Sequence, residues 1–148
     1  MRIDGLHHVV LDVPDVAAAE RFSADLFDLS VAFREGEYDG EYGRVPDGLD
    51  WPAARERGVD PGMTFLTRPG FALAVAEEPG SGDGGRLDHV ALAVDATAVE
   101  RIAESARGLG CEVDEREDVA FVTDRYGVGW ELNAGSPPPT CPFDDLDV

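Results

Sequence analysis

The spacing of hydrophobic residues changes along the chain, and these changes predict strands that alternate with helices. Residues 6–13 form a short run rich in β-branched and other apolar residues, which predicts a strand. In residues 14–29 the apolar positions recur at helical spacing, which predicts a helix. The apolar positions of this helix are Val16, Ala19, Phe22, Leu26 and Phe27. A strand therefore leads into a helix.

The second half of the chain repeats this order. Residues 87–94 resemble residues 6–13, and a helical stripe formed by Val99, Ile102, Ala103 and Ala106 follows them. Thr97 and Glu100 have the spacing of a capping box at the start of this helix, and Gly108 or Gly110 can end it. The chain therefore contains one unit twice.

Three short strands are predicted after each helix. They span residues 30–34, 63–68 and 71–76 in the first half, and residues 111–116, 119–123 and 128–133 in the second half. Each half thus follows the order β-α-β-β-β, so the predicted fold class is α+β. We expect one domain over residues 1–134, made of two tandem βαβββ modules at about 5–76 and 87–134. A Gly-rich linker at 77–86 joins them, and a Pro-rich acidic tail covers 135–148.

The first half also carries an insertion at residues 35–62 that the second half lacks. Long insertions of this kind often form lids or binding loops. The insertion equally fits a surface excursion with a short helix around Trp51 to Arg57, in which Trp51 anchors the segment to the body. The sequence leaves both alternatives open.

The charge of the chain restricts its partners and its setting. It has 31 acidic and 12 basic residues, every basic residue is arginine, and the net charge is −19. This field repels nucleic acid and anionic membranes, and it fits a halophilic source. Two cysteines, Cys111 and Cys141, are too few for a disulfide framework, and no apolar run approaches a membrane span. We expect a cytoplasmic protein with free thiols.

All three histidines lie in the two repeated strands, LHHVVLDV and LDHVALAV, where His8 corresponds to His89. Because alternate strand residues face opposite sides, His8 and His89 point away from the helices, whereas His7 points toward them. In the last strand Trp130 and Leu132 pack on the helical side, so Glu131 joins the histidine face. The first-half strand at 71–76 has only alanines on that face, which favours a cavity.

Two imidazoles and one carboxylate on a cavity predict a facial site for one divalent metal ion with positions free for a chelating substrate. A single strand histidine or glutamate is usually structural. The case for His8, His89 and Glu131 is stronger because the histidines are equivalent in a duplication and Glu131 reaches the same face independently.

The duplicated β-α-β-β-β plan, the two histidine strands and the closing GVGWEL strand resemble the vicinal oxygen chelate superfamily. The superfamily includes glyoxalase I, extradiol dioxygenases, methylmalonyl-CoA epimerases, fosfomycin-resistance transferases and bleomycin-resistance proteins. The resemblance covers residues 6–133 and implies a mixed, cup-shaped sheet of eight strands with helices outside. It also implies His8, His89 and Glu131 as ligands of one metal ion, which could be Fe, Mn, Zn or Ni.

Compared with many members of the superfamily that it resembles, this chain lacks one ligand. Many glyoxalase I and epimerase relatives add a glutamate or glutamine where this chain has Ala74, and Glu77 or Glu78 could replace it only if the register differed. This favours the three-ligand arrangement of extradiol dioxygenases and fosfomycin-type transferases. Glu131 and Tyr126 are the catalytic candidates, with Tyr38 and Tyr42 as further acid groups. The arginines that could bind an anionic substituent are Arg44, Arg68 and Arg125.

The resemblance implies a metal-dependent enzyme that acts on a small substrate chelated through neighbouring oxygens, by a lyase, isomerase, dioxygenase or transferase reaction. The alternative is a metal-free protein of the same fold that binds a small molecule, of the bleomycin-resistance type. A homodimer is expected in either case, with the modules paired within one chain or exchanged between chains.

Overall fold

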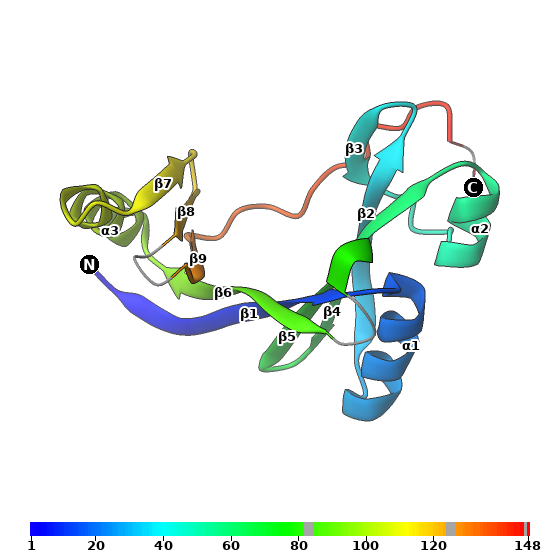
Figure 1. Cartoon of the computed structure of the whole chain (residues 1–148), viewed down its shortest axis with the longest axis horizontal. Coiled ribbons are helices and arrows are strands. Elements are labelled where there is room, and N and C mark those ends of the chain that lie inside the picture. Colours follow the sequence, from blue (N-terminus) through cyan, green and yellow to red (C-terminus); the bar gives the residue numbers. More distant parts are fainter. Residues whose placement is uncertain (82–84, 124–126, 147) are drawn as a thin grey trace. The chain divides into compact units, whose positions relative to one another are not determined.

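The computed structural model describes residues 1–81, 85–123, 127–146 and 148 (Figure 1). Its elements are β1 (Ile3–Val13), α1 (Val16–Phe27), β2 (Ser30–Tyr38), β3 (Glu41–Arg44), α2 (Trp51–Glu56), β4 (Asp60–Arg68), β5 (Phe71–Glu77), a 3-10 turn (Pro79–Ser81), β6 (Arg86–Val94), α3 (Ala96–Gly108), β7 (Glu112–Glu115), β8 (Val119–Thr123) and β9 (Gly129–Asn133). The predicted α+β class is confirmed. Over these described ranges there are nine strands instead of eight, because the insertion forms the short strand β3 and the helix α2.

The chain divides into two compact units, and the boundary falls inside β1. One unit contains Met1–Val10 and Leu87–Pro137, and we call it the histidine unit. The other contains Leu11–Arg86 and Pro138–Val148, and we call it the insertion unit. The front of the first strand is therefore packed with the second half of the chain.

A mixed sheet in the order β1-β6-β9-β8-β7 forms the body of the histidine unit. β6 and β9 run parallel, whereas β9, β8 and β7 are antiparallel neighbours. Helix α3 covers one face of this sheet with Ala98, Val99 and Ala103, which pack with Val94 and Leu132 in a buried core. Leu92 and Trp130 join the same core, as the side-chain alternation predicts. Glu131 and His89 lie at the alternate positions of their strands.

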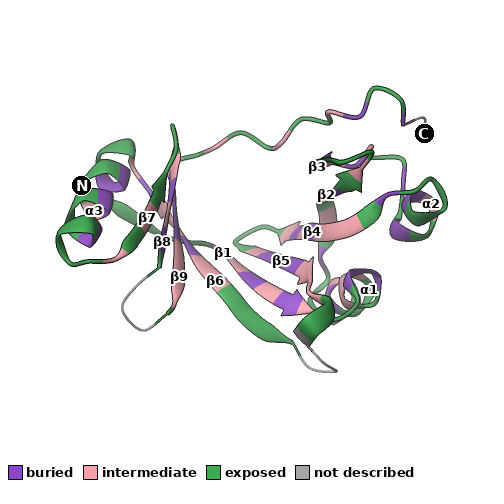
Figure 2. Ribbon diagram, turned by 45° about the horizontal axis from the view of Figure 1, so that its top comes forward, coloured by how far each residue is buried: buried purple, intermediate pink, exposed green. Residues whose placement is uncertain are grey.

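The insertion unit contains an antiparallel sheet in the order β3-β2-β4-β5. Helix α1 packs here with a different face from the one its apolar positions suggest. Val16, Ala17 and Ser23 are buried, whereas Phe22 is 67% and Leu26 57% exposed. Figure 2 shows both buried and exposed residues along α1. The predicted stripe is therefore split, and most of its large side chains lie on the surface.

A polar network explains the orientation of α1. The Glu20 carboxylate accepts two hydrogen bonds from the Arg34 guanidinium, at 2.6 and 2.8 Å, and a third from the Thr64 hydroxyl at 2.7 Å. The same hydroxyl accepts a hydrogen bond from Trp51 Nε1 at 2.7 Å, and Arg34 also donates to the Leu49 carbonyl. Trp51 is 1% exposed and thus anchors the insertion to the body, as in the second alternative above.

Aspartates cap all three α-helices of the described chain. Asp15, Asp50 and Asp95 each accept a hydrogen bond from the backbone N–H three residues later, which satisfies an unpaired group of the first turn. The predicted capping box at Thr97 and Glu100 is wrong, because α3 begins two residues earlier and Asp95 is its N-cap. None of the described helices combines the length and the apolar character needed to cross a bilayer.

The last residues of the chain pack within the insertion unit. The Pro139 carbonyl accepts a hydrogen bond from Arg44, and the Phe143 ring meets the Tyr38 ring edge to face at 5.8 Å between centroids. Phe143 and Leu146 are buried although the described tail has no helix or strand. The tail therefore contributes apolar side chains to the core around β3.

Candidate metal centre

His8, His89 and Glu131 converge within the histidine unit. One carboxylate oxygen of Glu131, Oε2, lies 3.0 Å from His89 Nε2 and 3.3 Å from His8 Nε2. The three candidate ligand atoms all lie within 4.8 Å of one another. The side chains of His8 and Glu131 are 8% and 10% exposed, whereas the His89 side chain is 20% exposed. The group is thus largely buried, and His89 is its most open member.

Three strands hold these side chains in place. His8 comes from β1, His89 from β6 and Glu131 from β9, and the parallel register sets Gly129 opposite His89 and Glu131 opposite Ala91. A Cβ atom at Gly129 would lie 3.2 Å from the His89 Cβ, so a larger residue would crowd that ring. The glycine allows the two strands to approach closely where the ligands meet.

Each of the three side chains also has a second polar atom that faces away from the candidate ligand atoms and contacts another residue. Asn133 Nδ2 donates to Glu131 Oε1 at 2.8 Å, and the Asn133 oxygen accepts from the backbone N–H groups of Gly135 and Ser136. The Asp88 carboxylate lies 2.6 Å from His89 Nδ1. The remaining nitrogen of each imidazole and one oxygen of the carboxylate are thereby turned toward a common point.

The predicted placement of His7 is wrong. Its side chain is exposed instead of packed under the helical layer, and its Nδ1 lies 2.7 Å from Nδ1 of His8. Strand alternation does place the two Cβ atoms on opposite faces, but near the exposed start of the strand the imidazole has room to turn toward its neighbour. His7 therefore borders the candidate metal centre.

Opposing effects set the charge state of the group. Burial acts to raise the pKa of the Glu131 carboxyl, but hydrogen bonds from His8, His89 and Asn133 outweigh it and hold that pKa far below its usual range. Burial acts to lower the pKa of His89, yet its contacts with Glu131 and Asp88 raise it overall. Burial and the neighbouring His8 lower the pKa of His7. Glu131 is consequently an ionised, acceptor-only group at neutral pH.

The donor set fits a divalent transition metal ion. Two imidazole nitrogens and one carboxylate oxygen are the ligands of facial sites, which leave the opposite coordination positions open. A buried carboxylate needs charge compensation, and a metal ion would supply more of it than neutral imidazoles do. In this arrangement His8 and His89 would bind through Nε2, and Glu131 through Oε2.

The pKa shifts predict how stability of the metal-free protein depends on pH. The raised pKa of His89 makes its pairing stabilising below the ordinary histidine value of 6.5, and this stabilisation is lost as the pH rises through the folded-state pKa. The lowered pKa of Glu131 makes its contribution complete above 4.5 and lost as the pH falls. We expect His89→Gln to lower the melting temperature of chelator-treated protein more at pH 5.5 than at pH 8.5. An equal loss at both values would contradict the pairing.

The other predicted acid groups either belong to the insertion unit or fall outside the described residues. Tyr126 falls outside the described residues, so it stays a prediction. Tyr38 and Tyr42 belong to the insertion unit, where burial and the Glu35 carboxylate raise the pKa of Tyr42 to about 12. Ala74, at the position of a fourth ligand in many relatives, is buried in β5. Glu77 does not replace it, because its carboxylate accepts from the Val16 backbone N–H and from Arg55.

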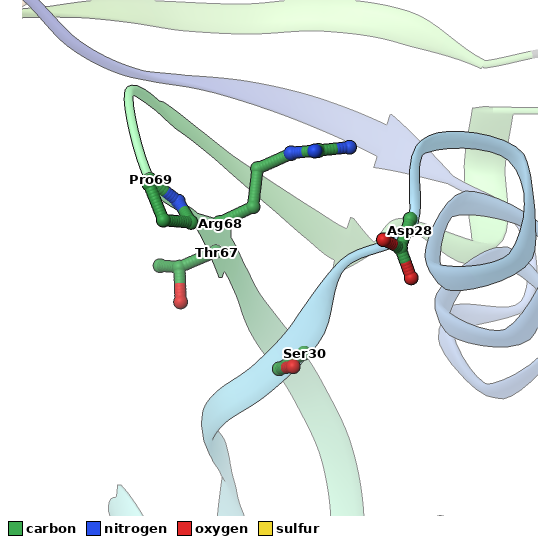
Figure 3. A pocket seen from close by; sticks show the side chains of 5 residues that line it. All are labelled: Asp28, Ser30, Thr67, Arg68 and Pro69. Atoms are coloured by element: carbon green, nitrogen blue, oxygen red, sulfur yellow. The ribbon is translucent and has the colours of Figure 1, made fainter.

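The described arginines that were candidates for anion binding have protein partners. Arg44 pairs with Asp47 at 2.8 Å. Arg68 donates to the Phe27 carbonyl, and Figure 3 shows its side chain reaching toward Asp28 across an open pocket of about 470 Å³ in the insertion unit. Arg125 lies outside the described residues. Both described candidates, Arg44 and Arg68, are therefore already engaged by other groups of the protein.

Two residues at the centre were not recognised as functional candidates in the sequence. Asp88 directly precedes His89 in the repeat, and Asn133 follows Glu131 by two positions on the same strand face. Strand alternation places Asn133 beside Glu131, and this signal was available. The contact of Asp88 has no such signal, because an adjacent residue normally points to the opposite face.

The comparisons with known proteins agree with this architecture. The Mycobacterium tuberculosis methylmalonyl-CoA epimerase structure is similar, with a TM-score of 0.57 and 17% identity, over 91% of this chain and 90% of that one. A single-residue variant of homoprotocatechuate 2,3-dioxygenase from Brevibacterium fuscum gives a TM-score of 0.63 and 17% identity, over 94% of this chain. This chain spans only 34% of that dioxygenase. At these identities the likeness shows the fold alone.

A third similar structure is a methylmalonyl-CoA epimerase variant from Streptomyces coelicolor in complex with 2-nitronate-propionyl-CoA. It has a TM-score of 0.55 and 17% identity, over 88% of this chain and 96% of that one. No curated protein matches the sequence closely. The sequence profile of the Glyoxalase/Bleomycin resistance protein/Dioxygenase superfamily, however, matches residues 5–145, nearly the whole chain. The chain therefore belongs to the glyoxalase/bleomycin resistance protein/dioxygenase superfamily.

Proposed function

We propose that this protein is an enzyme that holds one divalent metal ion with His8, His89 and Glu131 and acts on a small substrate with two neighbouring oxygens. The observation that supports the proposal most is the convergence of the three ligand atoms within 4.8 Å in a largely buried group. When bound, the metal ion would supply Lewis acidity, which stabilises negative charge developing on a substrate oxygen.

The residues of the chain would prepare this site before a substrate arrives. Glu131 carries its negative charge at neutral pH, and Asn133 holds the carboxylate oxygen that does not face the histidines. Such fixed side chains need little rearrangement when the reaction begins. Three protein ligands leave coordination positions for two substrate oxygens, which fits a chelating substrate.

A pocket beside His89 offers space for the rest of a small substrate. Its volume is about 280 Å³, and its lining combines aromatic and polar groups from the histidine unit: Asp88, His89, Phe121, Val122, Thr123, Gly127, Gly129 and Trp130. The Phe121 ring stands edge to face against His89, with 6.1 Å between ring centroids. The size favours a small organic molecule over a polymer.

The first test is the metal content of protein purified without chelators and of apoprotein reconstituted separately with Fe²⁺, Mn²⁺, Zn²⁺ and Ni²⁺. We expect elemental analysis to find about one ion per chain with at least one of these metals, because the site has one set of three ligands. Absence of metal in every sample would reject the enzyme proposal and favour a metal-free binding protein of the same fold. A bound metal would then direct the choice of substrates to screen.

A further inference from the structure

The residue before each candidate ligand histidine contacts the Nδ1 atom of that histidine. Asp88 Oδ2 lies 2.6 Å from His89 Nδ1, and His7 Nδ1 lies 2.7 Å from His8 Nδ1. The two contacts come from equivalent positions of the repeat, but one partner is a carboxylate and the other an imidazole. The duplicated strands therefore place a polar group against Nδ1 of each histidine, and this group is a carboxylate in one strand and an imidazole in the other.

We propose that Asp88 and His7 are positioning residues that make the two histidines unequal metal ligands, with His89 the stronger electron donor and His8 the weaker. This inference rests on the proposed function, since it concerns how the same site holds its metal ion. Neither residue would touch the metal. Each would act through the ring of the histidine that follows it.

The direction of the hydrogen bonds follows from the geometry around Glu131. Both histidines turn Nε2 toward Oε2 of Glu131, so metal binding at Nε2 requires the ring proton to sit on Nδ1. With metal bound, His89 would donate this proton to the Asp88 carboxylate in a charge-assisted hydrogen bond. A carboxylate acceptor fixes the orientation of the ring and increases the basicity of its ligand nitrogen.

The same reasoning assigns a different state to His7. With metal bound, His8 would donate its Nδ1 proton to Nδ1 of His7, which requires a neutral His7 with its own proton on Nε2. A neutral imidazole accepts a weaker hydrogen bond than a carboxylate. It therefore orients the His8 ring without increasing its basicity as Asp88 does for His89.

Zinc binding by four proteins tests the inequality: wild type, Asp88→Asn, His7→Phe and His7→Asp. Asp88→Asn keeps a hydrogen-bond acceptor but removes its charge, and it should lower zinc affinity by about 10-fold to 100-fold. His7→Phe should lower the affinity less than Asp88→Asn does. His7→Asp gives His8 a carboxylate partner, so it should raise the affinity. Glu104→Gln, which removes one charge from the exposed surface of α3, is the matched control and should leave the affinity unchanged.

Nitrogen-15 NMR of the zinc-loaded proteins shows which ring nitrogen of each histidine carries the proton. A general loss of stability would not change these positions. We expect protonated Nδ1 atoms on His8 and His89, a proton on Nε2 of His7, and a His89 Nδ1 proton that shifts upfield in Asp88→Asn. Equal effects of Asp88→Asn and His7→Phe on affinity, or weaker binding by His7→Asp, would overturn this inference alone. A wild-type protein that binds no zinc or other tested metal would overturn the proposed function as well.

Discussion

Replacing Glu131 with alanine is expected to lower the affinity for divalent metal by more than about 100-fold. This loss exceeds the roughly 10-fold to 100-fold loss that follows removal of a residue that only hydrogen-bonds to a metal ligand. The variant removes the only carboxylate of the three-residue group, and the two imidazoles that remain would bind metal less firmly. The affinity is measured by titrating chelator-treated protein with Zn²⁺ and detecting the bound ion. Circular dichroism checks that the strands remain.

The matched control for this experiment is Glu104→Ala, which removes an exposed glutamate from α3 in the same unit. It should bind metal as the wild type does. Unchanged affinity in Glu131→Ala would show that the carboxylate is no ligand. A similar loss in both variants would instead point to a general effect of charge on metal uptake.

The largest expected effect on stability follows the substitution Glu20→Ala. Glu20 and Arg34 have side chains that are only 12% and 14% exposed, and together with Thr64 and Trp51 they join α1, β2, β4 and α2. Removing one partner of a buried ion pair costs about 3–5 kcal/mol, and this partly buried pair should approach the lower end of that range because Arg34 is left uncompensated. This is a large part of the stability of a small domain. Denaturant unfolding in the presence of salt measures the loss.

Two further variants separate this network from a general effect on the helix. Asp25→Ala removes an exposed carboxylate from α1 and should change the free energy of unfolding little. A double variant with Glu20→Leu and Arg34→Met replaces both charges with apolar groups and should recover much of the loss. If the double variant were as unstable as Glu20→Ala, the cost would lie in lost packing and not in an unpaired charge.

The candidate metal centre could be predicted from the sequence because strand alternation is strict where strands are buried. The duplication relates His8 to His89, and the parity of Trp130 and Leu132 assigns Glu131 to the opposite face from α3. These two arguments depend on backbone geometry alone. Neither argument needs to know which long polar side chains pair with one another.

The parts that were not predicted depend on such pairing. The apolar residues of α1 suggested a buried stripe that includes Phe22 and Leu26, but the Glu20 contact with Arg34 turns another face of the helix inward. A charged residue within a helical pattern is normally assigned to solvent, so its partner on β2 could not be foreseen. His7 was misplaced for a related reason, because its ring turns toward His8 near an exposed strand end.

The division of β1 between two units has a consequence for the order of events during synthesis. The front of this strand, with His8, is synthesised before its neighbour β6 and before β9, which pairs with β6. A nascent chain that ends before Glu131 thus carries both histidines but lacks the carboxylate. Contacts between such distant segments form slowly, and the strand edge stays unpaired until they do. Binding of the proposed metal ion by all three residues would then have to wait until β9 has been synthesised.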